Sequence, residues 1–170
     1  MYNGNVVVYT GGTFDMFHSN HLKMIEYARG LGGTLIVGVS TDELVASYKK
    51  PPIIPFEERI AIIKALKYPD IVIPQRSLDH TELVKKLNID VFVVGDDWVG
   101  KYDYLKELGV TVFYFPRGEG ASSTSIKKSI VERYQNTIQD IDHQPNPDIV
   151  KCKHWSLEGV TASDCLLSCS

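Results

Sequence analysis

The sequence predicts an α/β fold, a doubly wound domain in which helices cover both faces of a five-stranded parallel sheet. Two observations predict it. Five short apolar runs rich in β-branched residues are spaced along the chain, and segments of helical periodicity alternate with them. The runs are almost continuously apolar, which is typical of strands that are buried on both faces of a parallel sheet.

The first half of the chain shows this pattern most clearly. A strand is predicted over 5–10 (NVVVYT), and a glycine turn separates it from a helix whose apolar face carries Leu22, Ile25 and Ala28. Glycines end this helix, and a second strand follows over 34–39 (TLIVGV). The segment therefore forms a strand, helix, strand unit.

The next segments are a helix start, a loop and a second long helix. Residues 40–43 (STDE) begin a helix, because hydroxyl and acidic side chains satisfy the N–H groups of a helix N-terminus. Three prolines exclude regular structure from 49–55, which we expect to be a loop. From 56 to 66 apolar residues recur at helical spacing with charges between them, which predicts an amphipathic helix.

The remaining elements continue the alternation. They are strands over 71–73, 90–94 and 110–115 and helices over 79–87, 102–108 and 122–134. Asp79 is expected to cap the first of these helices, and the adjacent His80 is expected on the surface. This order of strands and helices predicts a Rossmann-like sheet.

We expect one domain over 1–134 and an acidic, weakly ordered extension over 135–170. Up to residue 133 the chain carries 16 Lys+Arg and 16 Asp+Glu, whereas the remainder carries two basic and five acidic residues. All three cysteines, Cys152, Cys165 and Cys169, fall in the extension. An odd number of cysteines argues against a disulfide framework, and their spacing matches no common zinc site, so free thiols are expected.

Composition also argues against several classes of protein. The net charge of -3 gives no cationic excess, so nucleic acid is not an expected partner. The apolar runs fall far short of the roughly 20 residues that span a bilayer, and the N-terminus has no secretory signal pattern. We therefore expect a cytoplasmic protein without membrane insertion.

Ligands of open α/β sheets bind beyond the carboxyl ends of the strands. In this sequence the segments that follow strands are 10–21, 40–42, 95–97 and 117–124, and all are rich in polar residues. Because parallel strands end at the same edge, these segments are expected to converge there.

The segment after the first strand indicates an anion site. It has neither the G-x-G-x-x-G pattern of dinucleotide binding nor a P-loop, but His18 and His21 lie at i, i+3 near a helix start. Helix N–H groups and two imidazoles can bind phosphate oxygens, and bind a more highly charged transition state more strongly. From the residues alone, histidines that cap the helix or meet solvent remain an alternative. A metal site at the two histidines is less favoured, because no third ligand lies nearby in the sequence.

The segment after the last strand is a second anion signal. Arg117 offers a planar fork of donors, glycines allow close approach of the backbone, and Ser122 opens a helix with further hydroxyls after it. A flexible loop with Ser122 as a helix cap is the alternative.

Together the two segments resemble the cytidylyltransferases of the nucleotidyltransferase superfamily that carries an H-x-G-H motif. Residues 12–21 (GTFDMFHSNH) are similar to G-T-F-D-x-x-H-x-G-H, and 117–124 (RGEGASST) resemble R-T-E-G-I-S-T-[ST]. Residues 95–103 (GDDWVGKYD) are similar to the glycerol-phosphate branch of the family. The resemblance extends from about residue 6 to residue 133.

Three departures from the family pattern bear on the site. Asn20 stands in place of a glycine, Gly118 in place of a threonine, and Lys67 in place of the arginine usual in the glycerol-phosphate branch. Asn is one of the few non-glycine residues that tolerate unusual backbone angles. A lysine at 67 replaces a planar fork by a point charge.

The resemblance implies transfer of CMP from CTP to a small phosphomonoester, glycerol 3-phosphate in this branch, which gives CDP-glycerol and pyrophosphate. No covalent enzyme intermediate is implied, since such enzymes position the reactants and neutralise charge. It also implies Mg²⁺ that arrives with CTP, no metal held by the protein alone, and a homodimer.

The resemblance further implies roles for particular residues. The catalytic set is His18, His21, Lys50, Arg117 and Asp15. The CTP-binding set is Thr10, Gly11, Gly12, Thr13, Phe14, Lys49, Asp96, Ser122, Ser123 and Thr124. The acceptor-binding set is Asp15, Arg59, Lys67, Asp70 and Trp98. Trp98 can instead be a packing residue, and Asp97 can act as a turn cap or as a ligand.

Two rival functions remain open from the sequence. The first is cytidylyl or adenylyl transfer to another acceptor, such as phosphoethanolamine, phosphocholine or a sugar phosphate, because base selection by backbone groups leaves no sequence trace. The second is a nucleotide-binding module without turnover, which the departures at Asn20 and Gly118 motivate.

Overall fold

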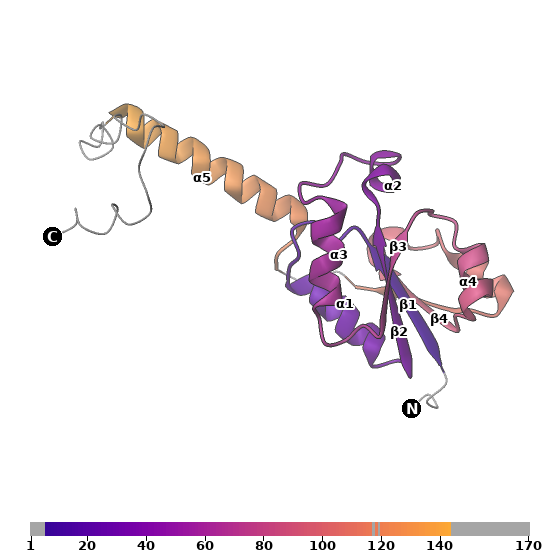
Figure 1. Cartoon of the computed structure of the whole chain (residues 1–170). Helices are drawn as coiled ribbons and strands as arrows, with labels where there is room; N and C mark the ends of the chain where they lie inside the picture. The colour runs from indigo at the N-terminus through magenta and orange to yellow at the C-terminus, as the bar shows by residue number, and fades with distance from the viewer. Residues whose placement is uncertain (1–5, 117, 119, 144–170) are drawn as a thin grey trace, which may run out of the picture. The chain divides into compact units, whose positions relative to one another are not determined.

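The computed structural model describes residues 6–116, 118 and 120–143. Five parallel strands form one sheet in the order β3-β2-β1-β4-β5, and the fold class expected from the sequence is confirmed (Figure 1). The strands are β1 (Val7–Gly12), β2 (Thr34–Ser40), β3 (Ile71–Gln75), β4 (Val91–Gly95) and β5 (Thr111–Phe115). Each predicted strand is present, with ends that differ by one or two residues.

Helices connect the strands. They are α1 (Ser19–Arg29), α2 (Asp42–Ala46), α3 (Phe56–Lys64), α4 (Thr81–Leu87) and α5 (Ser123–His143), with short 3-10 helices η1 (Asp96–Trp98) and η2 (Asp103–Leu108). The predicted helix over 102–108 is thus a 3-10 helix, which ends at Gly109 in the left-handed region, φ 82°. No helix of the described residues is long and apolar enough to cross a membrane.

The last helix is longer than expected. We predicted its end at residue 134, but α5 continues to His143. The prediction gave too much weight to polar residues as helix breakers; the first proline is Pro145, and aspartates disfavour a helix only weakly. The rest of the expected acidic extension and its three cysteines lie outside the described residues.

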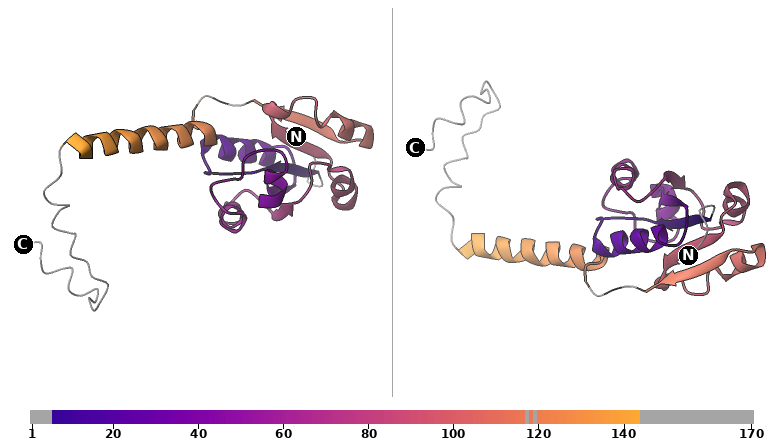
Figure 2. Two further views of the ribbon diagram at one scale, coloured as in Figure 1. Left: turned by 90° about the horizontal axis from the view of Figure 1, so that it is seen from above. Right: turned by 90° about the horizontal axis from the view of Figure 1, so that it is seen from below.

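Each face of the sheet has its own hydrophobic core. Successive residues of a strand point to opposite faces, so Val8 packs against α1 and α3 whereas Tyr9 packs against α4 and η2. Figures 1 and 2 show α1 and α3 on one face and α4 on the other. The sheet is therefore covered on both faces, and its carboxyl edge is left for a site.

A buried arginine joins the segments at this edge. Arg59 on α3 is 1% exposed, and its guanidinium donates to the carbonyls of Thr13, Ser40 (2.8 Å) and Ile54 (2.8 Å). It also pairs with Asp42 at 2.5 Å. The side chain fixes the loop after β1, the end of β2 and the proline loop relative to one another.

His80 is buried, and our prediction that it lies on the surface was wrong. It is 2% exposed and lies among the rings of Tyr9, Phe92 and Tyr102, with centroid separations of 5.4, 4.9 and 5.4 Å. Its sequence neighbours are polar, so nothing local signals this burial. Burial lowers the pKa of His80 to about 4, although the charge of Asp79 acts in the opposite direction. Asp79 itself lies one residue before the cap position and accepts the Thr81 N–H at 2.9 Å.

Replacement of Arg59 by methionine should lower the free energy of unfolding by about 3 kcal/mol, because several buried carbonyls and one carboxylate lose their donor. Arg59→Lys should recover only part of the loss, since an ammonium lacks the planar fork. Urea unfolding at 25 °C measures both variants. If the free energy of unfolding falls by less than about 1 kcal/mol in Arg59→Met, Arg59 does not hold the segments at this edge together.

The stability of the protein should fall between pH 6.5 and pH 4 in part because of His80. Over this range the unfolded chain binds a proton at His80 that the folded chain does not, so acid favours unfolding and stability rises with pH up to about 6.5. The difference amounts to about 3 kcal/mol at the acid end. Urea unfolding across the range should show a shallower pH dependence for His80→Leu than for the wild type; equal slopes would contradict the assignment.

Candidate active site

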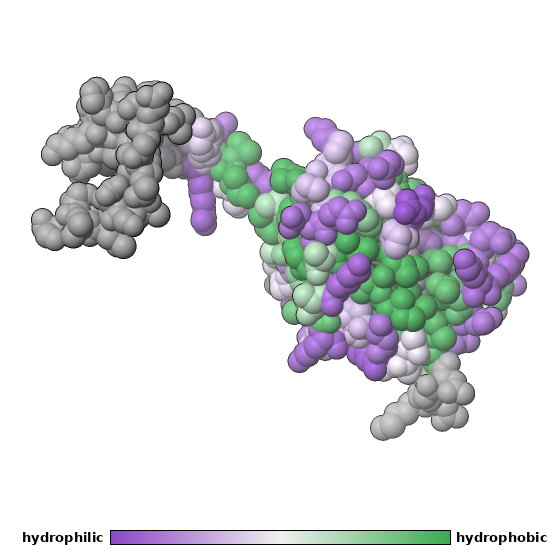
Figure 3. All heavy atoms as spheres, viewed as in Figure 1, coloured by the Kyte–Doolittle hydropathy of each residue, from purple (hydrophilic) through white to green (hydrophobic). Residues whose placement is uncertain are grey.

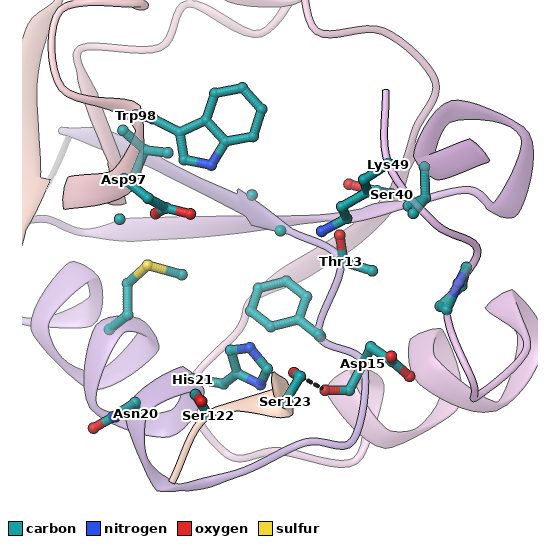
Figure 4. Close-up of a pocket in the computed structure, with 18 of the residues that line it drawn as sticks. Thr13, Asp15, Asn20, His21, Ser40, Lys49, Asp97, Trp98, Ser122 and Ser123 are labelled. Atoms are coloured by element: carbon teal, nitrogen blue, oxygen red, sulfur yellow. Dashed lines mark hydrogen bonds between the residues drawn. The ribbon is translucent and has the colours of Figure 1, made fainter. Parts of the chain in front are cut away.

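A cavity of about 630 Å³ lies at the carboxyl ends of β1 and β4, where the strand order reverses direction. Figure 4 shows Trp98 and Asp97 on one side and Lys49, Ser40 and Thr13 across from them. His21, Ser122 and Ser123 lie on a third side. The segments after β1, β2, β4 and β5 thus meet at one edge.

The two histidines lie together at the start of α1. His18 is the N-cap residue of α1, and its ring stacks on that of His21 with a centroid separation of 3.7 Å and an interplanar angle of 22°. Both line the cavity. The helix N-terminus, with its N–H groups and positive dipole end, and two imidazoles therefore face the same space, an arrangement suited to phosphate oxygens.

The loop that delivers the histidines has an uncommon backbone. Phe14 and Met16 have φ values of 54° and 51°, in the left-handed region that non-glycine residues rarely adopt. Phe14 is 2% exposed, and its ring contacts that of His21 edge-on at 5.4 Å. The packed Phe14 ring supports His21 from behind, and such backbone conformations gather at functional sites.

Asp15 ties this loop to two other segments. Its carboxylate accepts hydrogen bonds from the backbone N–H groups of Ile53 (3.1 Å) and Ile54 (3.0 Å) and pairs with Lys127 at 2.6 Å. Its carbonyl accepts a hydrogen bond from the Ser123 hydroxyl at 2.6 Å, drawn in Figure 4. Burial alone would raise the pKa of Asp15, but the hydrogen bonds from Lys127 and the two backbone groups outweigh it and lower the pKa.

The proline loop brings two lysines to the cavity. Lys49 and Lys50 both line it, and Lys49 Nζ lies 5.4 Å from the centroid of the Tyr48 ring. Tyr48 in turn meets Trp98 edge-on at 5.8 Å, and its hydroxyl lies 3.5 Å from that of Thr13. Trp98 is thus both a packing residue and part of the cavity wall.

The start of α5 forms the wall beside the histidines. Ser122, Ser123 and Thr124 all line the cavity. The Ser122 hydroxyl accepts the N–H of Ser125 at 3.0 Å, so it also caps the helix, as the alternative interpretation proposed. Arg117 lies outside the described residues.

The cavity also gathers the other expected nucleotide contacts. Gly11, Gly12, Thr13, Phe14 and Asp96 line it. An added Cβ at Gly11 would lie 2.5 Å from Gln75 Oε1, so a side chain there would displace the Gln75 amide. Gln75 accepts a hydrogen bond from the buried Tyr9 hydroxyl at 3.2 Å, and a Cβ at Gly38 would lie 1.9 Å from that hydroxyl.

Four expected contact residues are not brought to the cavity. Thr10 is fully buried within β1, and Arg59 is committed to the backbone carbonyls described above. Asp70 pairs with Arg29 and accepts the Leu35 N–H at 2.7 Å. Lys67 lies over the Tyr68 ring at 5.1 Å. Lys67 and Asp70 precede β3, which places them toward the amino edge of the parallel sheet, away from the cavity of the same chain.

The cavity contains residues to which the sequence analysis gave no role. Those with polar side chains include Asn20, Tyr48, Gln75, His80, Tyr102 and Lys127. Two of them left a signal: Gln75 ends β3 at the carboxyl edge, and Lys127 lies one helical turn after Ser123 and so shares its face. His80 and Tyr102 left none, since only the tertiary fold brings them there. Within the described part of the chain no group of three or more His, Cys, Asp or Glu could hold a metal ion.

Comparison with known proteins agrees with this arrangement. Residues 9–129 match the model of the cytidylyltransferase-like family. The chain is 44% identical over 124 residues to a glycerol-3-phosphate cytidylyltransferase of Bacillus subtilis, a match that covers 72% of this chain and 95% of that protein. The Staphylococcus aureus protein of the same name is 39% identical over 124 residues, covering 72% and 93%.

More distant similarities extend to other activities. An FAD synthase of Pyrococcus abyssi is 36% identical over 141 residues, covering 76% of this chain and 95% of that protein. Among solved structures, the lipopolysaccharide core biosynthesis protein from Thermoplasma volcanium matches with a TM-score of 0.58 and 26% identity, over 68% of this chain and 98% of that one. By the family match and by these relatives, the chain belongs to the cytidylyltransferase-like family.

Proposed function

We propose that the protein transfers CMP from CTP to glycerol 3-phosphate, which gives CDP-glycerol and pyrophosphate. The observation that carries the proposal is the cavity in which stacked His18 and His21 at a helix N-terminus face the start of α5. The relatives named for this activity, at 39% and 44% identity, support the choice of nucleotide and acceptor. A volume of about 630 Å³ is in the range of cavities that enclose a small-molecule ligand.

In the proposed reaction a phosphate oxygen of the acceptor attacks the α-phosphorus of CTP. A phosphorus–oxygen bond forms to the acceptor, the bond to the β-phosphate oxygen breaks, and pyrophosphate leaves with the bonding electron pair. The protein contributes position and charge rather than a covalent intermediate. His18 and His21 donate to the α-phosphate oxygens and to the departing pyrophosphate, where charge develops in the transition state.

The remaining cavity residues hold the substrates. Lys49 and Lys50 approach the phosphates from the proline loop, and the hydroxyl and N–H groups at 122–124 together with Arg117 bind the triphosphate. Thr13 helps to hold the phosphates, and the glycines beside it let the backbone approach them closely. Asp96 faces the nucleoside, and Trp98 contributes a wall to the acceptor site. Asp15 contributes by holding the proline loop and the start of α5 in place. Lys67 and Asp70 have no role in the proposed reaction.

A divalent cation fits this site as part of the substrate. Because the described residues hold no cluster of metal ligands, we propose that Mg²⁺ enters bound to the triphosphate oxygens and lowers their negative charge. The protein chain supplies the remaining cationic groups.

We also propose that the enzyme acts in the cytoplasm as a homodimer. Figure 3 shows hydrophobic side chains gathered over the sheet between α3 and α4. Ile71 on the edge strand β3 is 46% exposed, and an exposed apolar edge favours association.

The substrate assignment is tested by release of pyrophosphate. The protein is incubated with each nucleoside triphosphate and Mg²⁺, together with glycerol 3-phosphate, phosphoethanolamine, phosphocholine, a sugar phosphate or flavin mononucleotide. We expect turnover with CTP and glycerol 3-phosphate and little with the other pairs. Turnover with ATP alone would overturn the assignment. Because the chain is similar to an FAD synthase, the panel includes ATP together with flavin mononucleotide.

His18→Ala and His21→Ala should each lower kcat at least ~10²-fold, the usual scale for the loss of one transition-state donor. Ser19→Ala is the matched control, because Ser19 is exposed and lies in the same turn of α1. Circular dichroism establishes that each variant is folded. If both histidine variants keep wild-type turnover, or if the wild type binds CTP without turnover, the protein is a binding module.

A further inference from the structure

Asn20 connects the two motifs that line the cavity. It lies between His18 and His21 in α1, and its side-chain Nδ2 donates to the carbonyl of Gly118 at 3.2 Å and to that of Ala121 at 3.0 Å. These carbonyls belong to the segment that leads into α5, about 100 residues further along the chain. One amide group thus holds that segment against the start of α1.

The same side chain limits what residue 118 can be. A Cβ added at Gly118 would lie 3.3 Å from Asn20 Oδ1, closer than ordinary van der Waals contact. Asn20 Oδ1 is buried and accepts no hydrogen bond. A side chain at 118 would therefore press against the amide and require it to shift by a few tenths of an ångström.

These two positions are also departures from the motifs of the resembling family. Asn20 stands where that pattern has glycine, and Gly118 stands where it has threonine. In this chain the larger side chain lies on α1 and the smaller residue on the loop, the reverse of the family pattern. The two departures are in direct contact, through the hydrogen bond from Asn20 to the Gly118 carbonyl.

We propose that Asn20 and Gly118 form a coupled pair, in which the Asn20 amide positions the backbone at Gly118 and Ala121 for the triphosphate of CTP and disfavours a side chain at 118. Asn20 is a positioning residue in this proposal, which rests on the proposed function only for the identity of the nucleotide. Two further contacts, from Ser123 to the Asp15 carbonyl and from Lys127 to the Asp15 carboxylate, hold the start of α5 independently of Asn20. Loss of the amide should therefore affect nucleotide binding more than folding.

Asn20→Ala removes the donor and should raise the KM for CTP about tenfold, the scale of one or two lost hydrogen bonds, while kcat falls less than about threefold. Ser19→Ala, which alters the same turn without a contact to the loop, should leave both constants within about twofold. Hydrogen exchange of the backbone amides of 120–126 should be faster in Asn20→Ala without any nucleotide. An unchanged KM together with unchanged exchange would overturn the proposal, as would an equal fall in kcat with no change in KM.

A double-mutant cycle tests the coupling. Gly118→Thr should raise the KM for CTP about tenfold in the wild-type background, because its Cβ meets Asn20, and less than about twofold in the Asn20→Gly background. Ser19→Gly is the matched background, since it introduces glycine in the same turn and should leave the full effect of Gly118→Thr. If Gly118→Thr raises the KM for CTP by the same factor in the Asn20→Gly and wild-type backgrounds, the two residues are not coupled.

Hydrogen exchange separates failure of this proposal from failure of the proposed function. If the enzyme uses a different nucleotide, the CTP assays give no turnover, but exchange at 120–126 in the four members of the cycle still shows the coupling. If exchange is additive across the cycle, the pair is not coupled, whatever nucleotide the enzyme uses.

Discussion

The Asp15 carboxylate meets two segments that are distant in the sequence, the proline loop at 53–54 and α5 at Lys127, one turn after its start. The loop with Lys49 and Lys50 and the wall with Ser122 and Ser123 both take their positions from the turn that precedes α1. The ion pair with Lys127 and the two backbone N–H bonds lower the pKa of Asp15, so these contacts favour its charged form. This one buried negative charge thus links two walls of the cavity.

The buried Arg59 complements Asp15 from the other side of the same loop. It binds the carbonyl of Thr13, while Asp15, two residues later, binds backbone N–H groups of the proline loop. Between these residues the chain adopts the left-handed conformation at Phe14, a strain of order ~1–3 kcal/mol that persists only where the surroundings impose it. Arg59 on α3 and Asp15 on the loop thus hold an unfavourable backbone conformation. This conformation places His18 and His21 at the cavity.

The sequence predicted the parts of the fold that depend on local pattern. Apolar runs such as 34–39 located the strands, and the parallel order predicted that the polar segments after 10, 95 and 116 would meet. Contacts that form only in three dimensions were not accessible: the burial of His80 among aromatic rings, the commitment of Arg59 to carbonyl groups, and the placement of Lys67 and Asp70 away from the cavity. A motif names residue types in order, but it does not reveal which of them face a ligand and which face the protein.

The hydroxyl of Tyr9 reaches Gln75 across the surface of β2 at Gly38, where any Cβ would collide with it. This restricts the order in which the two positions can change during evolution. A lineage that first replaces Tyr9 by a smaller residue opens the space and can later accept alanine or serine at 38. A lineage that first replaces Gly38 must displace the phenol, and with it the partner of Gln75 in the cavity wall, before any benefit can follow. The accessible route therefore begins at the aromatic residue.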